Sequence, residues 1–551
     1  MPFRLHDSLT DATVPLPART PDATSLYVCG PTVYGYIHVG NARPPVVFDV
    51  LVRHLEAQGR RVQYVRNYTD IDDKIIAVAN ATGDDPRAVA ERFIAAYRED
   101  TAALGCRPPT AEPRVSEHLP HIIAHVEALL AKGFAYVTDE GDVYYDTARF
   151  ADYGKLSKRD VATGRAEFGR GKVGDCKRHE CDFALWKRAK AHEPEGARWP
   201  SPWGDGRPGW HIECSAMSHA ILGHGFDLHG GGMDLKFPHH ENEIAQSEAV
   251  YDGPMAGAWM HNGFIEVDLE RGASFAPEVA ARLPGLYERE PELRKISKSD
   301  RQRRDELAAR ADSLDADDAA RLAVYARKVQ VGEWFQLRAL LSRVDGEAVR
   351  LWILGTHYRA PLGFEVAEDN GTVRLPPIEA AEKRLEYFYD TRMKLAARRA
   401  AVGPAKPGAP KPTSLEFFVK VVADFDAALD DDLNTAGALD PLSRAFSRAN
   451  ELCDQKRPHP DDLEAAERTL VRLCSTLGVA DRDPEDFFAR VTGRRIAVRG
   501  LVRGDIEALV KARTEARAQR EFARADEIRT TLTAMGIELR DGASDTTWRA
   551  V

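Results

Sequence analysis

The chain has 551 residues, of which 43% are apolar and 29% are charged, and its formal net charge is −10. This length predicts three or four domains, and the composition is typical of a globular protein. The acidic balance excludes a protein that coats nucleic acid nonspecifically through bulk positive charge.

Targeting signals and cysteine usage indicate the compartment in which the protein works. The sequence has no uninterrupted apolar stretch of about 18 residues, and its first residues lack a basic region followed by an apolar core, so we expect neither a membrane span nor a signal peptide. The seven cysteines are dispersed along the chain, which is typical of reduced thiols and not of a disulfide framework. We therefore expect a cytoplasmic protein.

The first hundred residues alternate strand-like runs with helix-like runs, the pattern of a parallel α/β sheet. Strands are predicted at 26–29 and 62–66, and helices at 46–55 and 88–104. Ligands in such sheets bind at the carboxyl ends of the strands. Polar loops follow both predicted strands, from Cys29 to Arg43 and from Asn67 to Lys74, so a ligand site is expected there.

Composition changes divide the rest of the chain. Residues 111–208 are rich in Gly, Pro and Trp and interrupt the alternation, which predicts an insertion between two halves of the sheet domain. The α/β pattern resumes over 209–268. Residues 269–327 are charged and alanine-rich with few large apolar side chains, and we interpret them as a surface insertion. Helical periodicity then dominates, interrupted by a proline-rich linker at 400–413 that is expected to be disordered.

Four dispersed side chains offer the thiolate, imidazole and carboxylate ligands that Zn²⁺ prefers: Cys29, Cys214, His239 and Glu243. Cys29 ends a predicted strand, and His239 and Glu243 are spaced i, i+4 after Pro238, which places both on one face of a predicted helix. Singly, however, buried cysteines usually pack, and a His/Glu pair usually forms a solvated helix face. The residues alone leave both interpretations open.

The loop from Gly30 to Arg43 contains His38-Val39-Gly40-Asn41, where a helix is expected to begin. Backbone N–H groups and the helix dipole favour an anion at such a position. Gly40 allows a nucleotide to approach closely, and His38 can donate to phosphoryl oxygens. The loop therefore suits a nucleotide phosphate.

This loop resembles the HIGH signature of class I aminoacyl-tRNA synthetases, and within that class the chain resembles the cysteinyl-tRNA synthetase family. The resemblance covers nearly the whole chain except the charged insertion and the proline-rich linker. It is carried by the segments 65–74, 182–187, 201–204, 209–217, 229–234, 237–247, 430–435, 522–529 and 546–549.

The resemblance implies an α/β fold with a Rossmann-like parallel-sheet catalytic domain and an inserted connective domain, followed by a helical bundle and a small C-terminal module. The implied domains are the first half of the catalytic domain (1–110), the connective insertion (111–208), the second half (209–268), a lysine-loop and stem-contact region with the charged insertion (269–360), a helical tRNA-binding domain (361–480) and an anticodon-binding module (481–551).

The resemblance also implies site residues. One zinc ion would be held by Cys29, Cys214, His239 and Glu243 and would recognise the thiol of free cysteine, so no editing domain is expected. The amino-acid pocket would be lined by Thr69, Trp210, His229 and Asp234. We interpret His211 and His240 as structural. His38, Gly40 and Asn41 would bind ATP, with Mg²⁺ arriving with the nucleotide.

The lysine motif of this family resembles Lys295-Ile296-Ser297-Lys298-Ser299 here, but it lies in the middle of the charged insertion. A remnant of the segment that normally follows the motif appears only at 332–337. Either Lys295 and Lys298 act on ATP from a rebuilt loop, which we favour, or the loop proper is 326–330 and Lys328 is its lysine.

The implied activity is ATP-dependent formation of cysteinyl-AMP and transfer of the cysteinyl group to the 3′ end of tRNA(Cys), by a protein expected to be a monomer. Two alternatives remain: a cysteine ligase that acts on a small amine, and a non-catalytic tRNA-binding paralogue.

Overall fold

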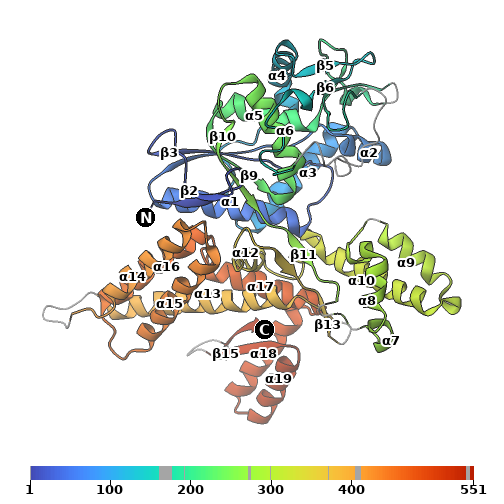
Figure 1. Cartoon of the computed structure of the whole chain (residues 1–551). Helices are drawn as coiled ribbons and strands as arrows, with labels where there is room; N and C mark the ends of the chain where they lie inside the picture. Colours follow the sequence, from blue (N-terminus) through green and yellow to red (C-terminus); the bar gives the residue numbers. More distant parts are fainter. Residues whose placement is uncertain are drawn as a thin grey trace. The chain divides into compact units, whose positions relative to one another are not determined.

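The computed structural model describes residues 2–159, 177–190, 193–270, 273, 275–297, 299–369, 372–403, 411–541 and 546–551 (Figure 1). The chain forms two compact units. Unit 1 comprises Met1–Glu266, Ile353–Gly363 and Ala423–Pro441, and unit 2 comprises Val267–Trp352, Phe364–Val422 and Leu442–Val551. No helix within the described ranges has the length and apolar character that crossing a membrane requires.

The centre of unit 1 is a four-stranded parallel sheet with the strand order β10-β9-β3-β4. Its strands are β3 (Ala23–Val28), β4 (Arg61–Arg66), β9 (Phe226–Gly232) and β10 (Ala256–Asn262). Leu26 pairs with Tyr64 on one side and with Leu228 on the other, and all three are buried. The predicted α/β class is therefore confirmed, and the first strand ends at Val28, one residue before Cys29.

Helix α1 (Val39–Ala57) connects β3 to β4 and packs on the sheet. Its Phe48 ring lies so close to β9 that a Cβ on Gly230 would be 2.3 Å from the ring. A glycine is therefore required at this position of the strand, because any other side chain would push the helix away. The predicted helix at 46–55 lies inside α1.

Further helices of unit 1 begin at recognisable caps. The Asp72 side chain accepts a hydrogen bond from Lys74 N at the start of α2 (Asp73–Thr82), and Asp85 accepts one from Arg87 N at the start of α3 (Pro86–Ala103). Helices α4 (Leu119–Ala131), α5 (Trp210–Leu222) and α6 (Glu241–Val250) pack against one another.

The segment between the two halves of the parallel sheet contains an antiparallel sheet with the order β5-β6-β7-β8. These strands are β5 (Ala135–Val137), β6 (Val143–Tyr145), β7 (Phe183–Arg188) and β8 (Gly206–Pro208). A hairpin of β1 (Arg4–Asp7) and β2 (Ala12–Pro15) precedes the parallel sheet. The short 3₁₀ helices of unit 1 outside the site are η1 (Val115–Glu117), η2 (Thr147–Arg149) and η3 (Glu195–Ala197).

The charged segment at the start of unit 2 has a small hydrophobic core of its own. It contains α7 (Pro277–Ala280), α8 (Leu283–Arg289), η6 (Pro291–Arg294), α9 (Asp300–Ala308), η7 (Ala311–Ser313) and α10 (Ala316–Phe335). The core is formed by Leu283, Leu286, Tyr287, Leu293, Leu307, Ala320, Val324 and Tyr325. Composition did not reveal this core, because its few apolar residues are widely spaced and only the tertiary fold gathers them.

The rest of unit 2 is mainly helical. It contains α11 (Leu337–Leu341), α13 (Pro376–Val402), α16 (Pro460–Leu477), α17 (Pro484–Val498), α18 (Arg503–Ala518), α19 (Phe522–Ala534) and two hairpins, β13 (Ala367–Asp369) with β14 (Thr372–Arg374) and β15 (Ile537–Asp541) with β16 (Thr546–Ala550). The C-terminal elements bury Ile496, Ile506, Val510, Leu532, Ile537 and Ala550.

Five elements carry residues of both units: β11 (Ile265–Val267), α12 (Gly346–Leu354), β12 (Leu362–Phe364), α14 (Leu415–Asp430) and α15 (Thr435–Asp454). Residues 404–410 of the predicted proline-rich linker lie outside the described residues. The domain boundaries inferred from the sequence stay predictions.

Candidate functional site

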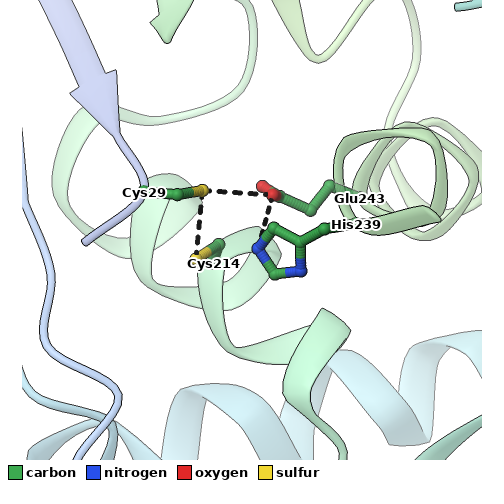
Figure 2. Close-up of side chains that lie close together, drawn as sticks. All are labelled: Cys29, Cys214, His239 and Glu243. Carbon is green, nitrogen blue, oxygen red and sulfur yellow. Dashed lines mark hydrogen bonds and ion pairs between the residues drawn. The ribbon is translucent and has the colours of Figure 1, made fainter. Parts of the chain in front are cut away.

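The structure brings the four predicted metal ligands together from four separate elements (Figure 2). Cys29 follows β3, Cys214 lies in α5, His239 lies in the short π-helix η5 (Lys236–His240), and Glu243 lies in the first turn of α6. Cys29 Sγ is 3.5 Å from Cys214 Sγ and 3.3 Å from Glu243 Oε1, which is 3.0 Å from His239 Nε2.

Two of these three separations, those of Cys29 Sγ from Cys214 Sγ and from Glu243 Oε1, fall in the range expected of a tetrahedral zinc site. Donor atoms about 2.0–2.3 Å from a tetrahedral zinc ion lie about 3.3–3.8 Å from one another. The four donor atoms here all lie within 4.8 Å of one another, and all four side chains are buried. Two thiols, an imidazole and a carboxylate are a suitable ligand set for this ion. Cys29 and Glu243 also form a second possible ligand group with His229 and His240.

Burial sets the protonation of these side chains. It raises the pKa of the Cys29 thiol well above its usual value, and it also raises the pKa of Cys214. Burial lowers the pKa of His239 to about 3. Burial acts to raise the pKa of Glu243, but its electrostatic interactions with His229 and His239 and its hydrogen bonds with His229 and Cys29 outweigh that effect, so this pKa is lowered. Both thiols are therefore protonated at neutral pH, and a bound cation would favour their thiolates.

Further histidines contact the ligands from behind. His229 Nε2 lies 2.8 Å from Glu243 Oε2, and His211 Nδ1 lies 3.1 Å from His239 Nδ1. His240 Nε2 lies 3.9 Å from Glu243 Oε1. Such contacts orient metal ligands.

The interpretation of His211 and His240 as structural did not anticipate these contacts. One sequence signal was present for His211: it precedes Cys214 by three positions, so the two residues share a face of α5.

Trp210 lies beside the cluster of Cys29, Cys214, His239 and Glu243. Its ring stacks on His239 with centroids 4.3 Å apart and an interplanar angle of 17°. Trp210 is 37% exposed. With Thr32, Gly209 and His211 it lines a cavity of about 400 Å³. Trp210 is therefore placed to form a wall between the ligand cluster and this cavity.

The other predicted pocket residues have different surroundings. Thr69 is buried, and its hydroxyl donates to Glu213 Oε2 at 2.8 Å. His229 is fully buried and stacks on Trp259 with centroids 4.4 Å apart. Asp234 is exposed and follows β9 in the 3₁₀ helix η4 (Met233–Leu235).

The predicted phosphate loop leads into α1. His38 is the N-cap of the helix, and its backbone N–H donates to Asn41 Oδ1 at 3.3 Å. Loss of bulk water around His38 lowers the pKa of its imidazole, partly opposed by the charge of Asp234. His38 and Asn41 are exposed and Gly40 is half-buried, at a helix start that favours an anion.

The candidate lysines differ in their surroundings. Lys295 is exposed, and Lys298 lies outside the described residues. Lys328 is 1% exposed in the regular helix α10, and its Nζ lies 2.8 Å from Asp300 Oδ1. Residues 326–330, the second candidate for the loop, are therefore helical in this structure.

Family models and curated relatives show that the chain is a class I aminoacyl-tRNA synthetase. Residues 16–275 match the model of the tRNA synthetases class I (C) catalytic domain. Residues 424–481 match a DALR domain, and residues 501–549 match the cysteinyl-tRNA ligase anticodon binding domain. Among solved structures, the Agrobacterium radiobacter K84 agnB2 LeuRS in a ternary complex aligns over 86% of both chains with a TM-score of 0.51 and 11% identity, which shows the shared fold.

Full-length relatives show to which family of this class the chain belongs. The chain is 41% identical over 561 residues to the cysteine–tRNA ligase of Anaeromyxobacter sp. (strain Fw109-5), and 39% identical over 551 residues to that of Geobacter sulfurreducens, with 100% of each chain covered. The chain belongs to the cysteine–tRNA ligase family, which confirms the resemblance found in the sequence.

Proposed function

We propose that this protein activates L-cysteine with ATP and transfers the cysteinyl group to tRNA(Cys). The observation that carries the proposal is the buried cluster of Cys29, Cys214, His239 and Glu243 beside the parallel sheet, in a chain with full-length similarity to cysteine–tRNA ligases. First, a carboxylate oxygen of cysteine attacks the α-phosphorus of ATP and pyrophosphate leaves. A hydroxyl of the terminal adenosine of the tRNA then attacks the acyl carbon and AMP leaves.

Selection of cysteine would depend on the ligand cluster. Serine differs from cysteine by one atom, so a steric pocket would distinguish them by only about 1–3 kcal/mol. Zinc bound at the cluster supplies a centre that binds sulfur and disfavours a neutral hydroxyl. Trp210 would form one wall of the pocket, and Asp234 would pair with the ammonium group of the substrate. Thr69 and His229 would complete the pocket.

The loop before α1 would hold the nucleotide. Backbone N–H groups near Gly40, the imidazole of His38 and the amide nitrogen of Asn41 would donate to the phosphates. Lys295 and Lys298 would neutralise charge as pyrophosphate leaves, with Mg²⁺ bound to the ATP. Catalysis would then consist of alignment and electrostatic stabilisation without a covalent enzyme intermediate.

The helical part of the chain and its C-terminal module would bind the tRNA, as expected from their matches to a DALR domain and an anticodon binding domain. These matches favour a tRNA substrate over a small amine. We further propose that the protein acts as a monomer in the cytoplasm.

The first test is ATP–pyrophosphate exchange by zinc-loaded protein with cysteine or serine. Exchange should depend on cysteine, and serine should give little. If cysteine supports no exchange, a non-catalytic tRNA-binding role replaces the proposal.

The second test is transfer of labelled cysteine to a tRNA(Cys) transcript. Transfer of the label to the tRNA supports the proposed activity. If the protein catalyses pyrophosphate exchange without this transfer and condenses cysteine with a small amine, it is the alternative ligase.

A further inference from the structure

The helical insertion separates two short segments that the fold of unit 2 brings back together. Ile296 lies in the lysine motif before α9, whereas Gly332 lies near the end of α10. A Cβ placed on Gly332 would be 3.4 Å from Ile296 Cγ2. Helices α9 and α10 therefore form a hairpin whose base joins the lysine motif to the remnant segment.

One buried carboxylate connects the two sides of this base. Asp300 Oδ2 accepts a hydrogen bond from the backbone N–H of Ser297 at 2.5 Å, and Asp300 Oδ1 lies 2.8 Å from Lys328 Nζ. The side chains of Asp300 and Lys328 are only 2% and 1% exposed. The Ser297 carbonyl also accepts from Asp300 N at 3.1 Å. Asp300 thus holds the backbone of the motif with one oxygen and α10 with the other.

The burial of this pair argues for a role in position more than in stability. A buried ion pair adds little net stability compared with apolar side chains, but removal of one partner leaves an unpaired charge. By contrast, the neighbouring pair of Arg301 and Glu333, at 2.7 Å, joins the same two helices at the exposed surface. The surface pair is a matched control, because such pairs contribute little.

We propose that Asp300 and Lys328 are positioning residues, which fix the backbone at Ser297, between Lys295 and Lys298, at the base of the α9/α10 hairpin. This inference rests on the proposed function, in which those lysines neutralise the triphosphate. It assigns Lys328 a role different from that of a loop lysine: its ammonium group holds Asp300 and does not contact ATP.

The test uses the full-length protein with Lys328→Met, Asp300→Asn, the exchanged pair Asp300→Lys/Lys328→Asp, and Arg301→Ala as the control. Two properties are measured: cysteine-dependent pyrophosphate exchange, with KM determined separately for ATP and cysteine, and the rate of tryptic cleavage after Lys295. Lys295 is exposed, so trypsin can reach it. The cleavage rate reports on the local backbone and does not depend on catalytic activity.

Lys328→Met should reduce kcat/KM for ATP by about 100-fold, the cost of misplacing reacting groups by about 1 Å, and leave the KM for cysteine unchanged. Cleavage after Lys295 should be faster in Lys328→Met and Asp300→Asn and unchanged in Arg301→Ala. The exchanged pair keeps the ion pair between the helices but removes the acceptor for Ser297 N–H. It should therefore unfold near the wild-type temperature while pyrophosphate exchange stays low.

The proposal would be overturned if Lys328→Met catalysed pyrophosphate exchange at the wild-type rate, or if the exchanged pair recovered that rate fully. The ion pair would then only stabilise the fold. The positioning role would also be overturned if the wild type were active but every variant were cleaved after Lys295 at the wild-type rate. The proposed function would then stand. Conversely, faster cleavage in the variants of a protein without exchange would support the positioning role and overturn the proposed function.

Discussion

Nε2 of His229 lies 2.8 Å from Oε2 of Glu243, while the other oxygen of the same carboxylate lies 3.3 Å from Cys29 Sγ. His229 therefore holds Glu243 from the side away from Cys29. Its full burial and this contact suit His229 to orient Glu243 as well, in addition to its proposed place at the pocket.

His229→Ala should weaken zinc binding by about 10- to 100-fold, as measured by competition with a chromogenic chelator. His229→Gln should lose less, because its amide can donate to the same oxygen. His224, which contacts the Gly253 carbonyl at 2.9 Å, provides the control variant His224→Gln. Unchanged zinc affinity with a raised KM for cysteine would instead support direct substrate binding by His229.

Zinc binding should release about two protons, because Cys29 and Cys214 are protonated in the metal-free protein and bind as thiolates. Glu243 and His239 have lowered pKa values, so near neutral pH they are already in their ligand forms and release none. Affinity should therefore rise by about two log units per pH unit and fall as the pH falls.

Calorimetry between pH 6.5 and 8, in buffers of different ionisation enthalpy, counts these protons. Cys29→Ser should lower the count to about one. Cys453→Ser, outside the ligand cluster, should leave it unchanged. A count of zero in the wild type would contradict the protonation inferred from burial.

Trp210→Ala should raise the KM for cysteine, because the ring stacks on His239 and lines the adjoining cavity. An aromatic contact of about 1 kcal/mol corresponds to roughly a fivefold change. Trp210→Phe should keep most of the aromatic contact with His239, so the KM for cysteine should rise less than in Trp210→Ala. The KM for ATP serves as the internal control. An equal rise in both KM values in pyrophosphate exchange would indicate general damage to the site and refute a specific wall.

Arg43→Ala should destabilise unit 1. The buried guanidinium donates to four carbonyls, those of Gly263 (2.8 Å), Phe264 (2.8 Å), His357 (3.1 Å) and Ala360 (2.7 Å). Loss of these bonds leaves buried acceptors unpaired, so the free energy of unfolding should fall by about 3 kcal/mol. Urea denaturation measures the change.

Arg43→Lys should recover only part of this loss, because an ammonium cannot reach four acceptors as a planar guanidinium does. Arg60→Ala removes a single side-chain contact to Thr24 at 3.3 Å and should have little effect. Equal stability of the Arg43 and Arg60 variants would contradict the structural role of Arg43.

Local patterns in the sequence were sufficient for the parallel sheet and for the position of Cys29 beside it. Alternating strand and helix patterns lie within contiguous residues, so they can be recognised without knowledge of tertiary contacts. The resemblance to the family then selected the four metal ligands from many dispersed Cys, His and Glu residues, and the structure brings these four together.

Only the tertiary structure decided which distant side chains meet. The contact of His211 with His239, the four carbonyls around Arg43 and the pairing of Lys328 with Asp300 join residues far apart in the chain. Periodicity indicates which face of an element is buried, but not which partner it will meet. Lys328 shows the difference: its sequence context left it open as the less favoured candidate for a phosphate-binding loop lysine, whereas packing of α9 against α10 places it in a buried ion pair.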